Sequence, residues 1–490
     1  MMSDMSLRGR AQHFVAAVTD AIRREPDFDR AMTLSVWLGR YLWSNFCGIY
    51  RIDELEHILL SKMQMPDVGV GANHAKRREL HVASAVYPNG GHTLLMKSLM
   101  AQAKLLPDVL LTRPVCRQEA ARILATAPEN VDVPEASLPT RAQIFQWARK
   151  MAGYETVVLH VHPDDMSAAL AVRWAKRINP DLFVGFMNHA DHAFSVAVGA
   201  ADKVFEISAY GWALRDRRGT EGRSTFVGIP ISPANARPQG GGQGGFALSG
   251  GAAYKYKPFR GQSLPMVLGQ LIKRDRRIRL VIIGPKSKDY WWWPLRLVAG
   301  RRLELLKPVH REAYFQLLSD CTFYIDSYPW PGGTAFPEAL MRGGNVAGLH
   351  GGSSGYSYAD LLRSESVDVF LDTCVKLAAG DPDVLRRQAE VREHCIAFHS
   401  PASVRQRMEA GFQLNYIELP PSEMLEHKQV ASAELDWIDS GRSITPSLTS
   451  LELDKVSKSL LLRLHVTHFG WFWHSTLKLA FDFYLKKRKG

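Results

Sequence analysis

Short apolar segments alternate with helical segments along most of this 490-residue chain, and this alternation limits the fold more than any other feature. In the first half, each apolar run is followed by a segment with helical periodicity. The strands predicted there are 80–86, 108–111, 156–161, 182–187 and 204–207. Such alternation predicts an α/β fold, in which helices cover both faces of a parallel sheet and ligands bind at the carboxyl ends of the strands.

A proline- and glycine-rich segment, 230–245, interrupts the pattern and predicts a domain boundary, because such a composition does not support a packed element. The pattern then restarts at Phe246 with the first strand of the second half, and further strands are predicted at 279–283, 303–306, 323–325 and 345–349 and helices at 264–273, 311–318 and 383–397. We therefore predict four parts: a helical cap (1–75), two facing Rossmann-like β/α domains (76–238 and 246–415) and a helical or amphipathic tail (416–490). A cleft between two such domains is a natural ligand site.

Composition narrows the classes of partner. The chain has 46% apolar residues, enough to fill several cores, and a formal net charge of +12. That charge suits an anionic ligand or an anionic membrane surface, but no long basic tract is present, so we do not expect a nucleic acid partner. The five cysteines lack C-x-x-C spacing, which predicts neither a disulfide framework nor a cysteine zinc site and favours a cytoplasmic location.

The two ends of the chain bear on its location. The first residues lack an apolar signal segment, and no stretch of about 18 apolar residues is free of charge, so we expect neither secretion nor a membrane span. From residue 460 the chain is rich in aromatic residues and ends in K-K-R-K-G. This tail is either a helix packed on the body or an interfacial helix on anionic lipid, which would make the protein a peripheral membrane protein at the inner face.

The stretch Y-I-D-S-Y-P-W-P-G-G-T-A-F-P-E-A-L-M (324–341) reads as a strand, a loop and a helix start. Gly332 and Gly333 allow close backbone approach, and Thr334 with the first helical amides favours a phosphate. Glu338, one turn later, could reach a sugar hydroxyl. Lys255 or Lys257, after the first strand of the second half, could bring an ammonium group to the same phosphate. The alternatives are an ordinary β-α turn and surface lysines.

A second group of candidates follows two strands of the first half. His92 lies in a G-G-H-T loop, and His189, Asp191 and His192 lie in N-H-A-D-H. An imidazole is the natural general base near neutral pH, and Asp191 could orient one. His92 has the better claim to be the base, because the glycines before it would let the donor sugar and the acceptor come close. The two histidines of N-H-A-D-H would point to opposite faces of an extended segment, so we expect at most one of them in the cleft. The alternatives are histidines that bind loop carbonyls and an Asp191 that caps a helix.

A third pattern concerns metal. The run H-V-H-P-D-D, from His160 and His162 to Asp165, resembles the H-x-H-x-D-H of metallo-β-lactamase-like hydrolases. His189 and His192 could complete such a site. Against this hypothesis, Asp165 stands where that family has a histidine.

The two β/α halves, the G-G-H-T loop and the D-x-x-P-x-x-G-G-T-x-x-x-E motif together resemble the GT-B glycosyltransferases over about residues 80–412. Within these they are nearest the O-GlcNAc transferase-like group, which includes cytoplasmic bacterial N-glucosyltransferases. The resemblance implies a UDP-sugar co-substrate with no tightly bound cofactor or metal. It implies that Thr334 binds the diphosphate, Glu338 the ribose and Lys255 a phosphate. Tetratricopeptide repeats are absent and Gly333 replaces a histidine, departures that bear on the acceptor.

From these patterns we expect a glycosyltransferase that moves a sugar from a nucleotide-sugar to a protein, glycan or lipid-linked acceptor. A histidine base opposite the donor would support direct displacement and therefore inversion. The alternatives are a sugar-nucleotide epimerase on the same scaffold and a metallohydrolase that uses His160 and His162.

Overall fold

The computed structural model describes residues 7–44, 48–63, 77–88, 90–134, 140–233, 244–259, 261–286, 288–351 and 355–425. In this part of the chain, the first half forms a seven-stranded parallel sheet in the order β3-β2-β1-β4-β5-β6-β7. Its strands are β1 (Arg77–Ala83), β2 (Asp108–Leu111), β3 (Val131–Asp132), β4 (Tyr154–His160), β5 (Phe183–Asn188), β6 (Lys203–Glu206) and β7 (Ser224–Phe226). Its helices are α4 (Gly91–Met100), α5 (Arg117–Leu124), α6 (Arg141–Ala152), α7 (Met166–Ile178), α8 (Ala209–Ala213) and α9 (Arg215–Arg218).

The second half forms a six-stranded parallel sheet, in the order β10-β9-β8-β11-β12-β13 over the described residues. Its strands are β8 (Phe246–Gly250), β9 (Arg279–Ile283), β10 (Leu303–Leu306), β11 (Phe323–Ile325), β12 (Val346–Leu349) and β13 (Arg363–Ser364). Its helices are α10 (Leu264–Arg274), α11 (Trp293–Ala299), α12 (Arg311–Asp320), α13 (Ala335–Met341), α14 (Val367–Ala379) and α15 (Pro382–His399). Two parallel sheets covered by helices confirm the predicted α/β fold class.

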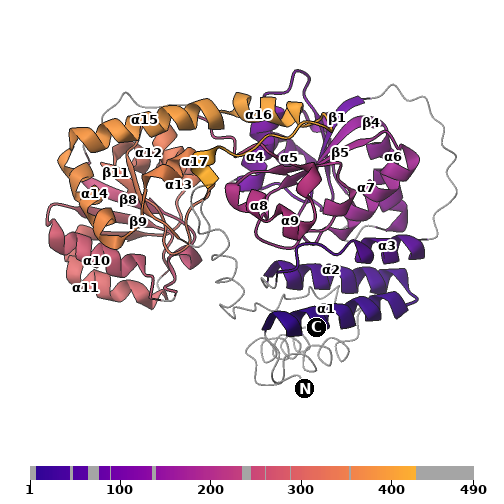
Figure 1. Ribbon diagram of the computed structural model, residues 1–490, viewed down its shortest axis with the longest axis horizontal. Helices are drawn as coiled ribbons and strands as arrows, with labels where there is room; N and C mark the ends of the chain where they lie inside the picture. The colour runs from indigo at the N-terminus through magenta and orange to yellow at the C-terminus, as the bar shows by residue number, and fades with distance from the viewer. Residues whose placement is uncertain are drawn as a thin grey trace.

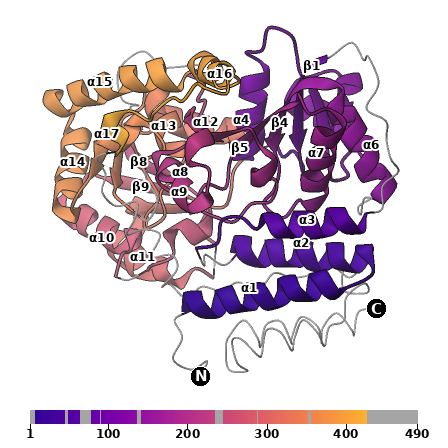
Figure 2. The same cartoon turned by 45° about the vertical axis from the view of Figure 1, so that its right-hand side comes forward.

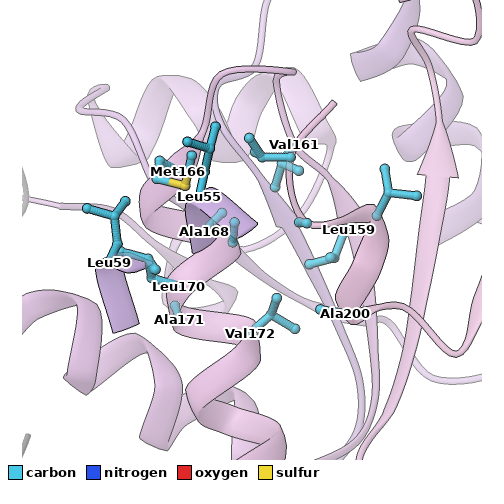
Figure 3. Packing of buried hydrophobic residues seen from close by; sticks show 14 of the residues in the cluster. Leu55, Leu59, Leu159, Val161, Met166, Ala168, Leu170, Ala171, Val172 and Ala200 are labelled. Carbon is cyan, nitrogen blue, oxygen red and sulfur yellow. The ribbon is translucent and has the colours of Figure 1, made fainter. Parts of the chain in front are cut away.

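Three amphipathic helices precede the first sheet: α1 (Leu7–Arg24), α2 (Phe28–Ser44) and α3 (Asp53–Lys62). They form a layer on one side of the first half (Figure 1). Leu55 and Leu59 of α3 pack against α7 (Figure 3). Arg173 of α7 also binds the buried Glu56 of α3, whose carboxylate accepts the Ala197 amide at 2.7 Å. The apolar faces of these helices therefore pack against one another and against α7, a helix of the first half.

The chain returns to the first half near its end. Helix α15 lies along the second half, and α16 (Pro401–Ala410) then packs against α4 (Figures 1 and 2). The amide of Phe226 donates to the carbonyl of Glu418 at 3.0 Å, and Lys203 donates to the carbonyl of Leu414 at 2.6 Å. Residues 400–418 thus contact the first half of the chain, although they belong by sequence to the end of the second predicted domain, whose boundary at 415 stays a prediction.

Most of the predicted tail, 426–490, lies outside the described residues, which end just after α17 (Ser422–Leu425). Among the helices that the structure describes, none has the length and apolar character needed to cross a bilayer.

Candidate active site

The glycine loop of the second half is held by a buried network of charges. Asp326, directly after β11, accepts the amide of Gly332 with both carboxylate oxygens, at 3.1 and 3.0 Å. Its carboxylate is paired at 2.8 Å with Arg363 of β13, which also binds Asp360. The Ser327 hydroxyl donates to the Trp330 carbonyl at 2.8 Å within the same loop. These contacts together fix the conformation of the loop.

The predicted role of Gly332 in close approach to a ligand stays a prediction. In the structure its amide donates to the Asp326 carboxylate. Gly332 has a steric role, because an added Cβ would lie 2.8 Å from a carboxylate oxygen of Asp326. Within the described residues, the amides of Gly333 and Thr334 have no recorded hydrogen-bond partner, so the donors available to a phosphate lie one and two positions further along.

The structure distinguishes the two candidate lysines. Lys255 lies in a short helical turn (Ala253–Tyr256) after β8, and its ammonium group donates to the carbonyl of Pro331 in the glycine loop at 3.1 Å. Burial lowers the pKa of Lys255, and the nearby Asp326 carboxylate opposes this shift. Lys257 is exposed. Lys255 and the glycine loop follow the neighbouring strands β8 and β11, so the two lie together although Lys255 and Pro331 are 76 residues apart in sequence.

Glu338 lies in the first turn of α13, as predicted. One carboxylate oxygen, Oε1, is 2.9 Å from Arg311 of α12 and 3.7 Å from Arg342. The residue is partly exposed. Its second oxygen remains available to a ligand hydroxyl, and Arg311 holds the carboxylate in place.

Histidines gather at the carboxyl ends of β1, β4 and β5. The Nε2 atom of His160 is 2.8 Å from Nδ1 of His81, and Nδ1 of His160 is 2.9 Å from Nε2 of His189. Burial lowers the pKa of His160 well below its usual value, and His81 and His189 act in the same direction. Burial, aided by His92, lowers the pKa of His189 to about 3. His160 and His189 are therefore neutral near pH 7.

His92 lies beside this group, with its ring centre 6.0 Å from that of His189. Its Nε2 atom donates to the Ala85 carbonyl at 3.1 Å, which leaves Nδ1 as the proton-accepting atom. Burial lowers the pKa of His92, and the hydrogen bond to Ala85 opposes this shift. The G-G-H-T loop and the N-H-A-D-H segment thus lie close together in the structure.

The N-H-A-D-H segment is a turn after β5, so the prediction of opposite faces, which assumed an extended segment, does not apply. His192 lies 3.0 Å from the buried carboxylate of Asp191, and Ser208 donates to the same carboxylate. Arg218 fixes this turn by donating to the Asp191 carbonyl at 2.5 Å and to Glu206 at 2.9 Å. Asp191 therefore makes the contact with an imidazole that an orienting role requires, and the role itself stays a prediction.

The four histidines proposed for a metal site are divided between different partners. His160 and His189 bind each other, whereas His162 pairs with Asp164 and His192 with Asp191. The side chain of Asp165 instead accepts the Ala168 amide at 3.1 Å and so caps α7. Within the described ranges, no group of three or more His, Cys, Asp or Glu side chains is arranged to hold a metal ion.

A contact between the two halves connects the histidine group of the first half with the glycine loop of the second half. The amide of Ala209, next to Ser208, donates to the Gly355 carbonyl at 2.7 Å. The adjacent Tyr356 ring lies 3.6 Å from where a Cβ on Gly333 would be. The segment 355–356 therefore lies between the Asp191 turn and the glycine loop.

Comparisons with known proteins agree with this architecture at the level of fold. No family model matches the chain, and no curated protein is similar to it in sequence. Among solved structures, a glycosyltransferase from Rickettsia africae superposes with a TM-score of 0.50 and 11% identity, over 72% of this chain and 100% of that one. The chain has the GT-B fold.

Two further structures are similar to this GT-B chain. An O-GlcNAc transferase from Thermobaculum terrenum gives a TM-score of 0.47 at 16% identity, over 89% of this chain and 82% of that one. The HepE protein of Anabaena, solved with UDP-glucose, gives 0.48 at 12% identity, over 68% of this chain and 98% of that one.

Sequence reasoning missed several polar residues that support the site of this GT-B chain. His81 carried a usable signal, because a histidine within an apolar strand is either buried with a partner or out of place. Arg363 carried none, since the charges that it joins come from positions that are distant in sequence. Glu79 pairs with Arg405, 326 residues away, and no local pattern predicts such a pair.

Proposed function

We propose that this protein is a glycosyltransferase that moves a sugar from a UDP-sugar to a protein, glycan or lipid-linked acceptor. The position of Lys255 carries this proposal. Its ammonium group lies on the glycine loop, 3.1 Å from the Pro331 carbonyl, and two and three residues further along this loop the amides of Gly333 and Thr334 have no hydrogen-bond partner among the described residues. A half-buried positive charge on a loop that carries such amides at a strand end suits a diphosphate.

In this proposal the donor lies on the second sheet. The amides of Gly333 and Thr334 and the Thr334 hydroxyl donate to the diphosphate, while the Glu338 carboxylate accepts a ribose hydroxyl. As the bond between the sugar C1 and the diphosphate oxygen breaks, its electron pair stays on that oxygen. Lys255 stabilises the negative charge that develops there.

The acceptor lies on the first sheet, on the side of the histidines. Its oxygen or nitrogen attacks the sugar C1 as the diphosphate leaves, and its proton passes to a neutral imidazole of the group His92, His189 and His192. Attack opposite the leaving group inverts the configuration at C1. Asp191, bonded to His192 at 3.0 Å, holds the turn that carries two of these imidazoles.

Donor binding should depend on α13 and the residue before it. Thr334→Ala removes a donor to the diphosphate and Glu338→Ala removes the ribose acceptor, and each such bond to a charged group is worth roughly 1.5–3 kcal/mol. We expect each variant to bind UDP at least about tenfold more weakly by calorimetry. Glu312→Ala, which removes an exposed carboxylate of the neighbouring α12, is the control and should bind as the parent does. Parental affinity in both test variants would refute this donor site.

The three histidines should differ in their effect on transfer. We expect His189→Ala to lower the transfer rate about 10²-fold, as removal of a general base does, while UDP affinity stays within about twofold. His92→Ala and His192→Ala should cost less. The measurements are the transfer rate at saturating donor and, separately, the dissociation constant of UDP. Equal and modest losses at all three positions would show that none of them is the base.

A further inference from the structure

A chain of hydrogen bonds connects His189 to a buried carboxylate inside the first sheet. It runs from His189 through His160 to His81, whose Nε2 atom lies 2.6 Å from Oε1 of Glu79. We propose that Glu79, acting through His81 and His160, makes Nδ1 of His189 the proton-accepting atom, and that the positive charge gained in transfer is held at His81. The inference rests on the proposed function and extends it by three positioning residues.

The tautomers follow from the acceptor at the inner end. Hydrogen bonds from His81 and Arg405 outweigh the effect of burial and lower the pKa of the Glu79 carboxyl to about 2, so Glu79 only accepts. His81 must then carry its proton on Nε2, which leaves Nδ1 to accept from Nε2 of His160. His160 therefore carries its proton on Nε2, and its bare Nδ1 accepts a hydrogen bond from Nε2 of His189. The proton of His189 thus lies on Nε2.

The outer end of the chain is consequently a bare ring nitrogen. Within the described residues, Nδ1 of His189 has no recorded hydrogen-bond partner, and the side chain is partly exposed beyond the end of β5. A histidine that bonded a loop carbonyl through Nδ1–H would present the opposite tautomer. The buried carboxylate thus selects the basic form of an imidazole two histidines away.

The chain can also move the charge inward with all atoms balanced. The acceptor proton joins Nδ1 of His189, the Nε2 proton of His189 passes to Nδ1 of His160, and the Nε2 proton of His160 passes to Nδ1 of His81. His81 then carries protons on both nitrogens and faces the Glu79 carboxylate. His160 and His189 end neutral, each with its proton on Nδ1, and one proton later returns to water.

The inner end is held by the helix that crosses from the second half. Arg405 of α16 donates to both oxygens of Glu79, at 2.8 and 2.6 Å, and also donates to Glu409 at 2.8 Å. The Glu79 carboxylate therefore accepts hydrogen bonds from both Arg405 and His81, and these bonds fix its orientation. When Glu79 is replaced by a neutral residue, Arg405 still has Glu409 as an acidic partner.

The first test reads the tautomer without any reaction. In protein labelled with ¹⁵N-histidine, protonated and bare ring nitrogens give well separated resonances, which single histidine substitutions assign. At neutral pH we expect Nδ1 of His189 to be bare in the parent chain, and this preference to be lost in Glu79→Met, which removes the oxygen that accepts from Nε2 of His81. A protonated Nδ1 of His189 in the parent would overturn the proposal, and this measurement decides it even where a variant does not fold.

The second test is kinetic. Glu79→Gln removes the charge that stabilises protonated His81, and His160→Gln keeps polar contacts but cannot pass a proton. Each should lower kcat roughly 10²-fold with the KM for the donor unchanged, and the double variant should be no slower than the slower single variant. Single variants with parental kcat, or losses that multiply in the double variant, would overturn the relay.

The control is Tyr154→Phe, which removes a hydrogen bond of 2.7 Å to Asp108 in the same sheet and should keep the parental kcat. The two proposals fail separately. A parent chain that binds no nucleotide-sugar refutes the proposed function while the tautomer remains readable. A parent chain that transfers sugar with a protonated His189 Nδ1 refutes the relay alone.

Discussion

Replacing Lys255 by alanine is expected to lower the rate of sugar transfer about 10³-fold, the upper range for removing one stabilising group from a developing oxyanion. The physical reason is its position, because its ammonium group lies on the glycine loop 3.1 Å from the Pro331 carbonyl, where the leaving diphosphate would bind. Lys255→Met, which keeps the packed aliphatic stem, should show the same loss with the melting temperature of the parent. Initial rates and thermal unfolding measure the two quantities.

Lys257 provides the matched control for this prediction. It has the same chemistry two positions further along, but its side chain is exposed. Lys257→Ala should therefore change neither the rate nor the melting temperature. If the Lys257 variant were inactive and the Lys255 variant active, our account would have assigned the role to the wrong lysine.

Replacing Arg363 by methionine is expected to lower the free energy of unfolding by about 3–5 kcal/mol, the cost of leaving buried charges unpaired. Arg363 is buried between Asp326, at 2.8 Å, and Asp360. It also donates to the Leu349 carbonyl at 3.3 Å. Burial alone would raise the pKa of the Asp360 carboxyl, but the charge and hydrogen bond of Arg363 keep this pKa below its usual value. Urea unfolding measures the loss.

The control for Arg363 is Arg386→Met on α15, which removes an exposed pair with Asp383 of 2.8 Å. Exposed pairs contribute little, so unfolding of this variant should match the parent. Arg363 holds Asp326, and Asp326 in turn fixes the Gly332 amide of the glycine loop. The Arg363 variant should therefore bind UDP more weakly even at temperatures where the variant is folded. Equal stability of the two variants would contradict the role of the network.

The pattern of apolar runs predicted the strands of both sheets where a strand is a continuous apolar segment. β2, β9, β10 and β11 have the predicted bounds because most of their residues are apolar. The sequence did not predict β3, β7 or β13, since each has only two or three residues and is paired through its neighbours in the sheet. Ser224 and Thr225 of β7 are buried although they are polar.

The candidate site was predictable where strand ends place residues together. The rule that carboxyl ends of parallel strands meet was enough to bring Lys255 to the loop of Gly333, and His92 to His189. It could not predict that Asp326 takes the Gly332 amide, because that bond depends on the loop conformation. Nor could it predict the pair of Glu79 with Arg405, which exists only because α16 crosses back to the first half.

The central claim is that a nucleotide-sugar binds the glycine loop of the second half. Saturation-transfer NMR of the parent chain with UDP-, GDP- and ADP-sugars tests it most directly, with Glu338→Ala and Glu312→Ala measured beside it. We predict that UDP-sugars show transfer to the uridine and ribose protons, that Glu338→Ala reduces the transfer to the ribose protons and that Glu312→Ala keeps it. Absence of transfer with every nucleotide-sugar, or transfer that Glu338→Ala leaves unchanged, would contradict the account.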